Sequence, residues 1–342
     1  MNSSKLIGSD RIQDAGGPVP KTILVSGASG IVGYGILRSL RKSPDEYRLI
    51  GTTIHDFSIA PAFCDVCEIA LRTNEPGYMD WLAEMIKKHS VDMVIPGIEC
   101  DVFLWNTKRD RIVSTGAIPL LNKSELITLC SDKWDFYQRL IIDNEKYAIP
   151  TTLNGEYGTF PVPFLLKPRR GYGSKGIVTI KNRNEFEAYK HKIGPELMMQ
   201  PIVGSENDEY TVSAFFDSES RLVDHMALRR KLSRDGYTQE AQVVVLDLGT
   251  FLDDMAATFK PVGPTNLQFR IADGSIRLLE INPRISAATS IRASFGYNES
   301  VMSVEFFLKK RVPSRSDRSR STGRRAIRYT EDYILSDDCT NK

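Results

Sequence analysis

The segment Leu278-Leu279-Glu280-Ile281-Asn282-Pro283-Arg284 decides how the second half of this sequence is interpreted. Its apolar run predicts a strand over 276–281. Residues two positions apart in a strand point to the same face, so Glu280, Asn282 and Arg284 are predicted to lie together. A polar solvent face of an antiparallel sheet would explain Glu280 well, but it explains Asn-Pro-Arg after an apolar run poorly.

A second predicted strand, 265–271, comes just before this one. Asp273-Gly274 separates the two strands and favours a hairpin turn. Gln268 in the first strand can therefore face Glu280 and Asn282 in the second.

The residue types in this hairpin predict a metal site. Oxygen ligands from Gln268, Glu280 and Asn282 suit Mg²⁺, which needs few protein ligands beside phosphate oxygens, with Mn²⁺ as an alternative. Arg284 shares the face, and its guanidinium could meet a phosphoryl group during transfer.

A glycine-rich segment earlier in the chain is a candidate phosphate loop. Lys167-Pro168 ends a predicted strand, 164–167, and residues 169–176 read Arg-Arg-Gly-Tyr-Gly-Ser-Lys-Gly. Such a loop between antiparallel strands can fold over phosphates and donate backbone N–H groups, and Lys167, Arg169 and Arg170 add positive charge. A β-hairpin with a flexible basic loop fits this motif equally well.

The predicted elements divide the chain into an α/β region and an α+β region. Strands and helices alternate in the first, which is typical of a doubly wound parallel sheet, and strands dominate the second, which indicates a mostly antiparallel sheet. The first region has strands 22–26, 48–53 and 91–95 and helices 32–41 and 78–89. The second adds strands 176–180, 197–200, 210–216, 222–228 and 242–247 to those already given. With 342 residues, two or three domains are expected, and we predict a leader (1–20), a first domain (21–121), a second domain (122–335) and a tail (336–342).

A second glycine-rich turn, 27–33, follows the first predicted strand and opens a helix. Its GxxGxxG spacing suggests a dinucleotide site, as in short-chain dehydrogenases. No tyrosine has a lysine four positions later, however, and Asp56 lies too far along to bind a ribose. The turn is therefore predicted to be a helix N-terminus that favours an anion.

On these motifs the sequence resembles the ATP-grasp superfamily over residues 21–310, and especially the branch typified by the large subunit of carbamoyl-phosphate synthetase. The most specific part is Gln-Phe at 268–269, with Glu-Ile-Asn-Pro-Arg at 280–284 and Ile-Ser-Ala-Ala-Thr at 285–289. The resemblance implies a doubly wound domain followed by a single ATP-grasp domain, with a lid at 150–204 and a larger subdomain at 205–335.

The resemblance also implies roles for individual residues. Gln268, Glu280 and Asn282 would bind Mg²⁺, while Arg284 would contact the γ-phosphate or the acyl phosphate and Arg230 would be a second catalytic residue. The ATP-binding set would be Lys133, Lys167, Gly171, Gly173, Ser174, Gly176, Gln200, Pro201, Ile202, Val203 and Glu209, with Glu206 a less favoured alternative to Glu209 for the ribose. Residues near the acceptor substrate would be Ser29, Gly30, Glu99 and Ser286.

The composition favours a small-molecule enzyme. A net charge of +2 does not suggest nucleic acid, and no segment resembles a membrane span or a signal peptide. Five cysteines without zinc-site spacing fit a reducing cytoplasm. We interpret the basic segment 309–328 as a solvated loop before a final strand, 326–335. A homodimer is the simplest assembly.

These features predict an ATP-dependent carboxylate–amine ligase that forms an acyl phosphate and releases ADP and phosphate. The substrates would be a small carboxylate and an amine. Phosphorylation of bicarbonate or carbamate, a nucleotide sensor without turnover, and a nicotinamide oxidoreductase are the alternatives.

Overall fold

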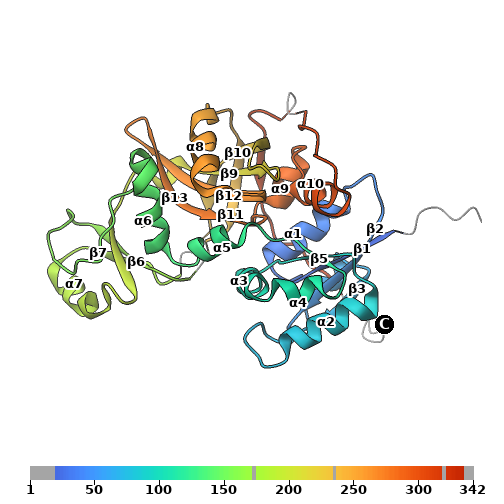
Figure 1. Ribbon diagram of the computed structural model, residues 1–342. Helices are drawn as coiled ribbons and strands as arrows, with labels where there is room; N and C mark the ends of the chain where they lie inside the picture. The colour runs from blue at the N-terminus through green and yellow to red at the C-terminus, as the bar shows by residue number, and fades with distance from the viewer. Residues whose placement is uncertain (1–19, 172–174, 234–235, 318–320, 335–342) are drawn as a thin grey trace, which may run out of the picture.

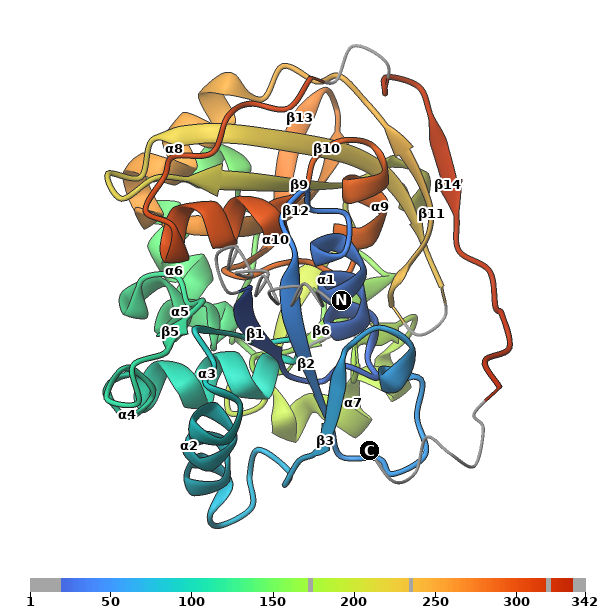
Figure 2. The same ribbon diagram turned by 90° about the vertical axis from the view of Figure 1, so that its right-hand side faces the viewer.

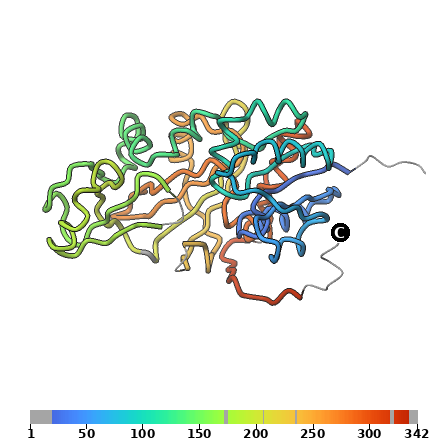
Figure 3. The backbone as a smooth tube through the Cα atoms, turned by 90° about the horizontal axis from the view of Figure 1, so that it is seen from below, coloured from blue at the N-terminus to red at the C-terminus, as the bar shows by residue number. Residues whose placement is uncertain are grey.

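Three β-sheets organise the chain (Figure 1). The computed structural model describes residues 20–171, 175–233, 236–317 and 321–334, so the predicted tail and all but the last residue of the predicted leader lie outside the described residues. Figure 3 shows an elongated molecule, in which the segment that carries the smallest sheet projects at one end. No helix among these residues has the length and apolar character needed to cross a bilayer.

The first sheet is fully parallel, with strand order β3-β2-β1-β4-β5. Alternate residues of β1 supply its two faces: Ile23 and Val25 pack with helix α1, whereas Leu24 packs with α2 and α3. The predicted doubly wound unit is therefore confirmed. Its elements are β1 (Lys21–Val25), α1 (Ile31–Leu40), β2 (Tyr47–Thr53), η1 (Ala60–Ala62), β3 (Val66–Ile69), α2 (Tyr78–His89), β4 (Met93–Ile95), α3 (Glu99–Thr107), α4 (Arg109–Val113) and β5 (Ile118–Pro119).

A three-stranded antiparallel sheet, β7-β6-β8, lies at the opposite end of the molecule (Figure 1). It has its own small core, in which Phe164 and Met199 pack against Phe186 of α7. Two helices lead into it, and the elements are α5 (Ser124–Cys130), α6 (Lys133–Asn144), η2 (Glu145–Tyr147), β6 (Phe164–Pro168), β7 (Val178–Ile180), α7 (Arg183–Tyr189), η3 (Lys190–Lys192) and β8 (Leu197–Pro201).

The largest sheet is antiparallel and has strand order β13-β12-β9-β10-β11-β14. Val212 and Phe216 of β9 face α5, α6 and α8, while Phe215 between them faces α9 and α10. The predicted α+β region is thus confirmed. Its elements are η4 (Glu206–Asp208), β9 (Glu209–Phe216), β10 (Leu222–Leu232), β11 (Thr238–Val243), α8 (Gly249–Phe259), β12 (Gly263–Ala272), β13 (Ser275–Asn282), α9 (Thr289–Ser294), α10 (Glu299–Ser303), η5 (Val304–Leu308) and β14 (Arg325–Ile327).

Two predicted strands are placed differently by the structure. The strand predicted at 242–247 is instead β11 (Thr238–Val243), because its partner β10 continues through Arg229–Lys231, whose charges hid the strand from a search for apolar runs. Val245 is exposed, so the apolar residues after Val243 do not form a buried strand. The strand predicted at 326–335 is reduced to β14 (Arg325–Ile327).

Candidate active site

The β12–β13 hairpin brings the three predicted metal ligands together. Gln268 pairs with Glu280 in the strand register, and Asn266 pairs with Asn282. The Asn282 side-chain amide donates a hydrogen bond to Glu280 Oε1 at 3.0 Å. Oxygen atoms of Gln268, Glu280 and Asn282 therefore gather on one face of two adjacent strands, because a β-bulge at Leu279 brings Gln268 opposite Glu280.

Positive side chains surround this oxygen group. Lys167 at the end of β6 is buried, and its Nζ donates to the Leu279 carbonyl at 3.4 Å. Burial lowers the pKa of Lys167. Burial acts to raise the pKa of Glu280, but the charges of Lys167, Lys133 and Arg230 and the amide of Asn282 together bring that pKa below its usual value. Glu280 is thus held as a carboxylate among cations.

Arg230 of β10 is placed between Glu209 and Gln268. It donates to Glu209 Oε1 at 2.8 Å and also to Gln268 Oε1. Its Nε is buried and finds no hydrogen-bond partner among the described residues. A buried N–H without an acceptor is costly, so this donor marks a place where a bound anion would add stability.

Arg270 was missed from the sequence, although it lies two positions from Gln268 in the same strand. It donates to Glu209 Oε2 at 3.0 Å and to the Val203 carbonyl at 3.2 Å. Both oxygens of Glu209, the predicted ribose ligand, are therefore engaged by arginines. Arg270 also fixes the backbone at Val203, one of the predicted ATP-binding residues.

The other predicted nucleotide residues lie around the small sheet. Lys133 Nζ donates to the Gly171 carbonyl, which connects α6 to the start of the glycine-rich loop. Gly176 ends the loop, while Gly173 and Ser174 lie outside the described residues. The side chain of Gln200 is buried and donates to Thr151 Oγ1 at 3.0 Å, and its backbone pairs with Leu165 of β6, so both are engaged within the protein. Pro201 ends β8, and Ile202 next to it is exposed.

Asp132 gives the basic residues of the glycine-rich loop a structural role. Its buried carboxylate caps α6 by accepting from the Trp134 N–H at 2.9 Å, and it pairs with Arg169 at 3.0 Å and Arg170 at 3.1 Å. Arg169 and Arg170, which were counted as phosphate-binding charge, therefore anchor the base of the loop. Asp132 was missed because its partners are far away in the sequence.

Arg284 joins the large sheet to the first one. Its Nη2 donates to Glu99 Oε2 at 3.1 Å and to Asn282 Oδ1 at 3.4 Å. Glu99 begins α3, just after the carboxyl end of β4. The predicted catalytic arginine and the predicted acceptor-site carboxylate are thus in direct contact.

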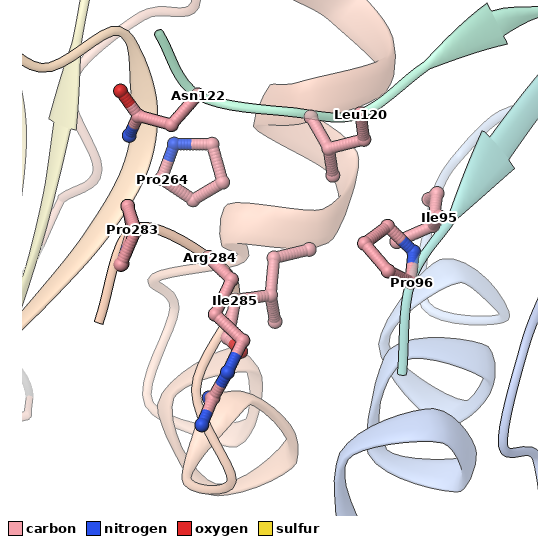
Figure 4. Close-up of a pocket in the computed structure, with 8 residues that line it drawn as sticks. All are labelled: Ile95, Pro96, Leu120, Asn122, Pro264, Pro283, Arg284 and Ile285. Carbon is pink, nitrogen blue, oxygen red and sulfur yellow. The ribbon is translucent and has the colours of Figure 1, made fainter. Parts of the chain in front are cut away.

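A small hollow lies beside this contact. Figure 4 shows Ile95 and Pro96, from the end of β4, across from Arg284 and Ile285, which follow β13. Leu120, Asn122, Pro264 and Pro283 complete its lining. The hollow therefore opens where the carboxyl ends of parallel strands meet the segment after β13, which is where open α/β sheets usually bind ligands.

The turn at 27–33 lies at the same sheet edge. Ser29 Oγ is 2.9 Å from Thr53 Oγ1, and the Gly30 N–H donates to the Gly27 carbonyl at 2.8 Å. A Cβ added at Gly33 would approach that carbonyl oxygen to 2.2 Å, so glycine is required there for close packing. The glycine pattern is therefore explained without a dinucleotide.

Ser286, which the resemblance places near the acceptor substrate, is buried in the structure. Its Oγ accepts from Arg292 Nη1, and Arg292 forms a fully buried ion pair with Glu299 at 3.7 Å. Arg292 also donates to Asn266 Oδ1 at 3.3 Å. The Ser286 hydroxyl thus supports the loop after β13 from inside.

The residues fit a magnesium ion with few protein ligands. Within the described ranges no three His, Cys, Asp or Glu side chains are grouped so that they could hold a metal. A site here therefore depends on amide oxygens, and Gln268 and Asn282 supply these beside Glu280. This donor set suits Mg²⁺ that completes its shell with phosphate oxygens and water.

Two family models match the chain. One, described as "ATP-grasp in the biosynthetic pathway with Ter operon", covers residues 194–331, and an ATP-grasp domain model covers residues 130–240. Among curated protein sequences, none matches.

Solved structures with the same fold include three enzymes. N5-carboxyaminoimidazole synthetase from Staphylococcus aureus, complexed with ADP, has a TM-score of 0.67 at 14% identity, covering 87% of this chain and 79% of that one. The biotin carboxylase domain of 2-oxoglutarate carboxylase from Hydrogenobacter thermophilus, with MgADP and bicarbonate, has a TM-score of 0.67 at 13% identity, with coverage of 86% and 71%. L-amino acid ligase from Bacillus licheniformis has a TM-score of 0.63 at 13% identity, with coverage of 84% and 74%.

Proposed function

We propose, from the premise that this chain belongs to the ATP-grasp superfamily, that it is an ATP-dependent carboxylate–amine ligase. One observation carries the proposal: the register that places Gln268 opposite Glu280 gathers three oxygen donors beside the buried Lys167. Oxygen donors next to cations match the needs of a metal-bound polyphosphate.

The charged residues of the site would act by holding the metal ion and the phosphate groups in place and by balancing their charge. Mg²⁺ held by Gln268, Glu280 and Asn282 would neutralise phosphate charge as ATP reacts. Lys167 and Lys133 would hold phosphate oxygens, and the unpartnered Nε of Arg230 would donate to another.

The reaction would take place between the two larger sheets. A substrate carboxylate would attack the γ-phosphate and release ADP, and Arg284 would stabilise the charge of the resulting acyl phosphate. An amine would then attack the acyl carbon, forming an amide and releasing phosphate. No nucleophile from the protein is required, and Glu99 would keep the Arg284 guanidinium oriented.

Bicarbonate or carbamate phosphorylation is the second candidate. The fold shared with a bicarbonate-bound biotin carboxylase domain favours it, as does the small size of the hollow beside Arg284. A sensor without turnover is disfavoured because the oxygen donors and cations are all present. We also propose the domain boundaries predicted above, a cytoplasmic location and a homodimer.

Identifying the reaction products tests the proposed function directly. The protein would be incubated with Mg-ATP and pairs of carboxylates and amines, including bicarbonate with ammonia, and products would be analysed by mass spectrometry. Formation of an amide with equal amounts of ADP and phosphate supports the ligase. ADP release with bicarbonate alone supports the second candidate, and binding of Mg-ATP without turnover across the panel favours the sensor.

A further inference from the structure

Hydrogen bonds attach the basic segment 309–328 to β10 of the large sheet and to the end of α9. Arg315 Nε donates to the Val223 carbonyl at 3.1 Å, and Ser321 Oγ donates to the Phe295 carbonyl at 2.7 Å. Figure 2 shows β14 beside β11 at the edge of this sheet. Most of the described residues of this segment are nevertheless exposed and lie in a loop before β14, as predicted, and Ser321 is the buried exception among them.

Arg328, directly after β14, turns toward the loop that follows β13. Its backbone N–H donates to the Gln239 carbonyl at 2.9 Å, which continues the pairing with β11. Its Nη2 donates to the Ala287 carbonyl, and its Nη1 is buried without a hydrogen-bond partner among the described residues.

The charge of Arg328 is unbalanced. In the described part of the chain no carboxylate lies within 4.0 Å of its guanidinium, whereas Arg230, Arg284 and Arg292 each have one. The titratable neighbours of Arg328 are Tyr34, Tyr237 and the like-charged Arg38, and burial lowers the pKa of Arg328. A partly buried cation without a counter-ion is costly, and an anion would remove that cost.

The position of Arg328 separates it from the phosphate cluster. Its neighbours Tyr34 and Arg38 both belong to α1, the helix that follows the predicted acceptor turn, and the Tyr34 N–H donates to the Gly30 carbonyl at 3.0 Å. Arg284, on the same loop as Ala287, contacts Glu99 and Asn282 instead. The two arginines therefore have different surroundings.

We propose that Arg328 binds a carboxylate on the amine-bearing acceptor, so that the acceptor is an amino acid or a similarly charged amine. This inference rests on the proposed ligase function. It assigns a specificity role to the end of the basic segment, because the Ala287 carbonyl engages Nη2 while Nη1 has no hydrogen-bond partner among the described residues.

The test compares L-amino acids with their carboxamides as acceptors, using kcat/KM for ADP release in the presence of Mg-ATP and a carboxylate panel. The wild type is expected to prefer the acid, and Arg328→Met to lose about 10- to 100-fold on the acid but not on the carboxamide, because only the charge-assisted bond is removed. Arg328→Lys should retain part of the preference. Arg325→Met, at an exposed position of β14, is the matched control and should behave as wild type.

Binding measured by thermal shift with the same acids and carboxamides needs no turnover. Stabilisation by an acid and not by its carboxamide, lost in Arg328→Met but kept in Arg325→Met, is expected. Equal stabilisation by both, or a preference that survives in Arg328→Met, overturns the assignment of Arg328 even if ligase activity is present. Acid-selective binding without any ADP release instead overturns the ligase proposal and leaves the assignment intact.

Discussion

Replacing Glu280 with glutamine should abolish most of the effect of Mg²⁺ on ATP binding. Glu280 is the one carboxylate among the three candidate ligands, and glutamine preserves its size and an oxygen that can accept from Asn282. Two unit charges about 4 Å apart interact by about 4 kcal/mol at an effective dielectric constant of 20. Because the amide oxygen keeps part of the coordination, we expect the Mg²⁺-dependent gain in ATP affinity to fall by about 100- to 1000-fold.

Isothermal titration calorimetry with ATP, in excess Mg²⁺ or in EDTA, measures this gain without knowledge of the acceptor. Glu240→Gln is the matched control, because Glu240 lies on β11 of the same sheet and forms only an exposed pair with Lys231 at 3.6 Å. The control should retain the wild-type response. The reasoning is refuted if Glu280→Gln is folded and still binds Mg-ATP as tightly as the wild type does.

Three further predictions concern separate parts of the site. Burial lowers the pKa of Lys167, and the charge of bound phosphate would raise that pKa again. ATP binding should therefore take up a proton at alkaline pH, and the affinity for ATP should fall as the pH rises through the lowered pKa. Calorimetry in two buffers of different ionisation enthalpy should show this proton uptake in the wild type and not in Lys167→Met. Glu99→Gln should lower kcat by about 10- to 100-fold through loss of Arg284 orientation while leaving the dissociation constant of Mg-ATP unchanged, and an equal loss of ATP affinity would argue against that role. Arg292→Met should lower the free energy of unfolding in urea by about 3–5 kcal/mol because Glu299 stays buried without its partner, and Arg292→Met with Glu299→Leu should regain part of this loss.

The hairpin at the site could be predicted because its signals are local. Asp273-Gly274 fixes the turn, but this turn alone would pair Gln268 with Leu279. A β-bulge at Leu279 shifts the register by one residue and brings Gln268 opposite Glu280, and no local signal predicts that bulge. The doubly wound sheet, like the turn, was predicted from local signals, since each strand and helix has its own apolar periodicity.

The supporting charges could not be predicted because their partners are distant. Arg292 bonds to Thr211, which is 81 residues away, and Asp132 pairs with Arg169 across 37 residues. A lone arginine in the sequence gives no sign of whether it is solvated or buried. Arg328 shows the same limit, because a basic run that normally indicates a solvated loop here ends against the Ala287 carbonyl.

The transfer of oxygen from substrate to phosphate tests the central claim most directly. The carboxylate identified in the product screen would be labelled with ¹⁸O and incubated with Mg-ATP and its amine, and the released phosphate would be analysed by mass spectrometry. Formation of an acyl phosphate at the Gln268, Glu280 and Asn282 site predicts one ¹⁸O atom in each phosphate, together with ADP. Unlabelled phosphate, or release of AMP and pyrophosphate, would contradict the proposed ligase mechanism.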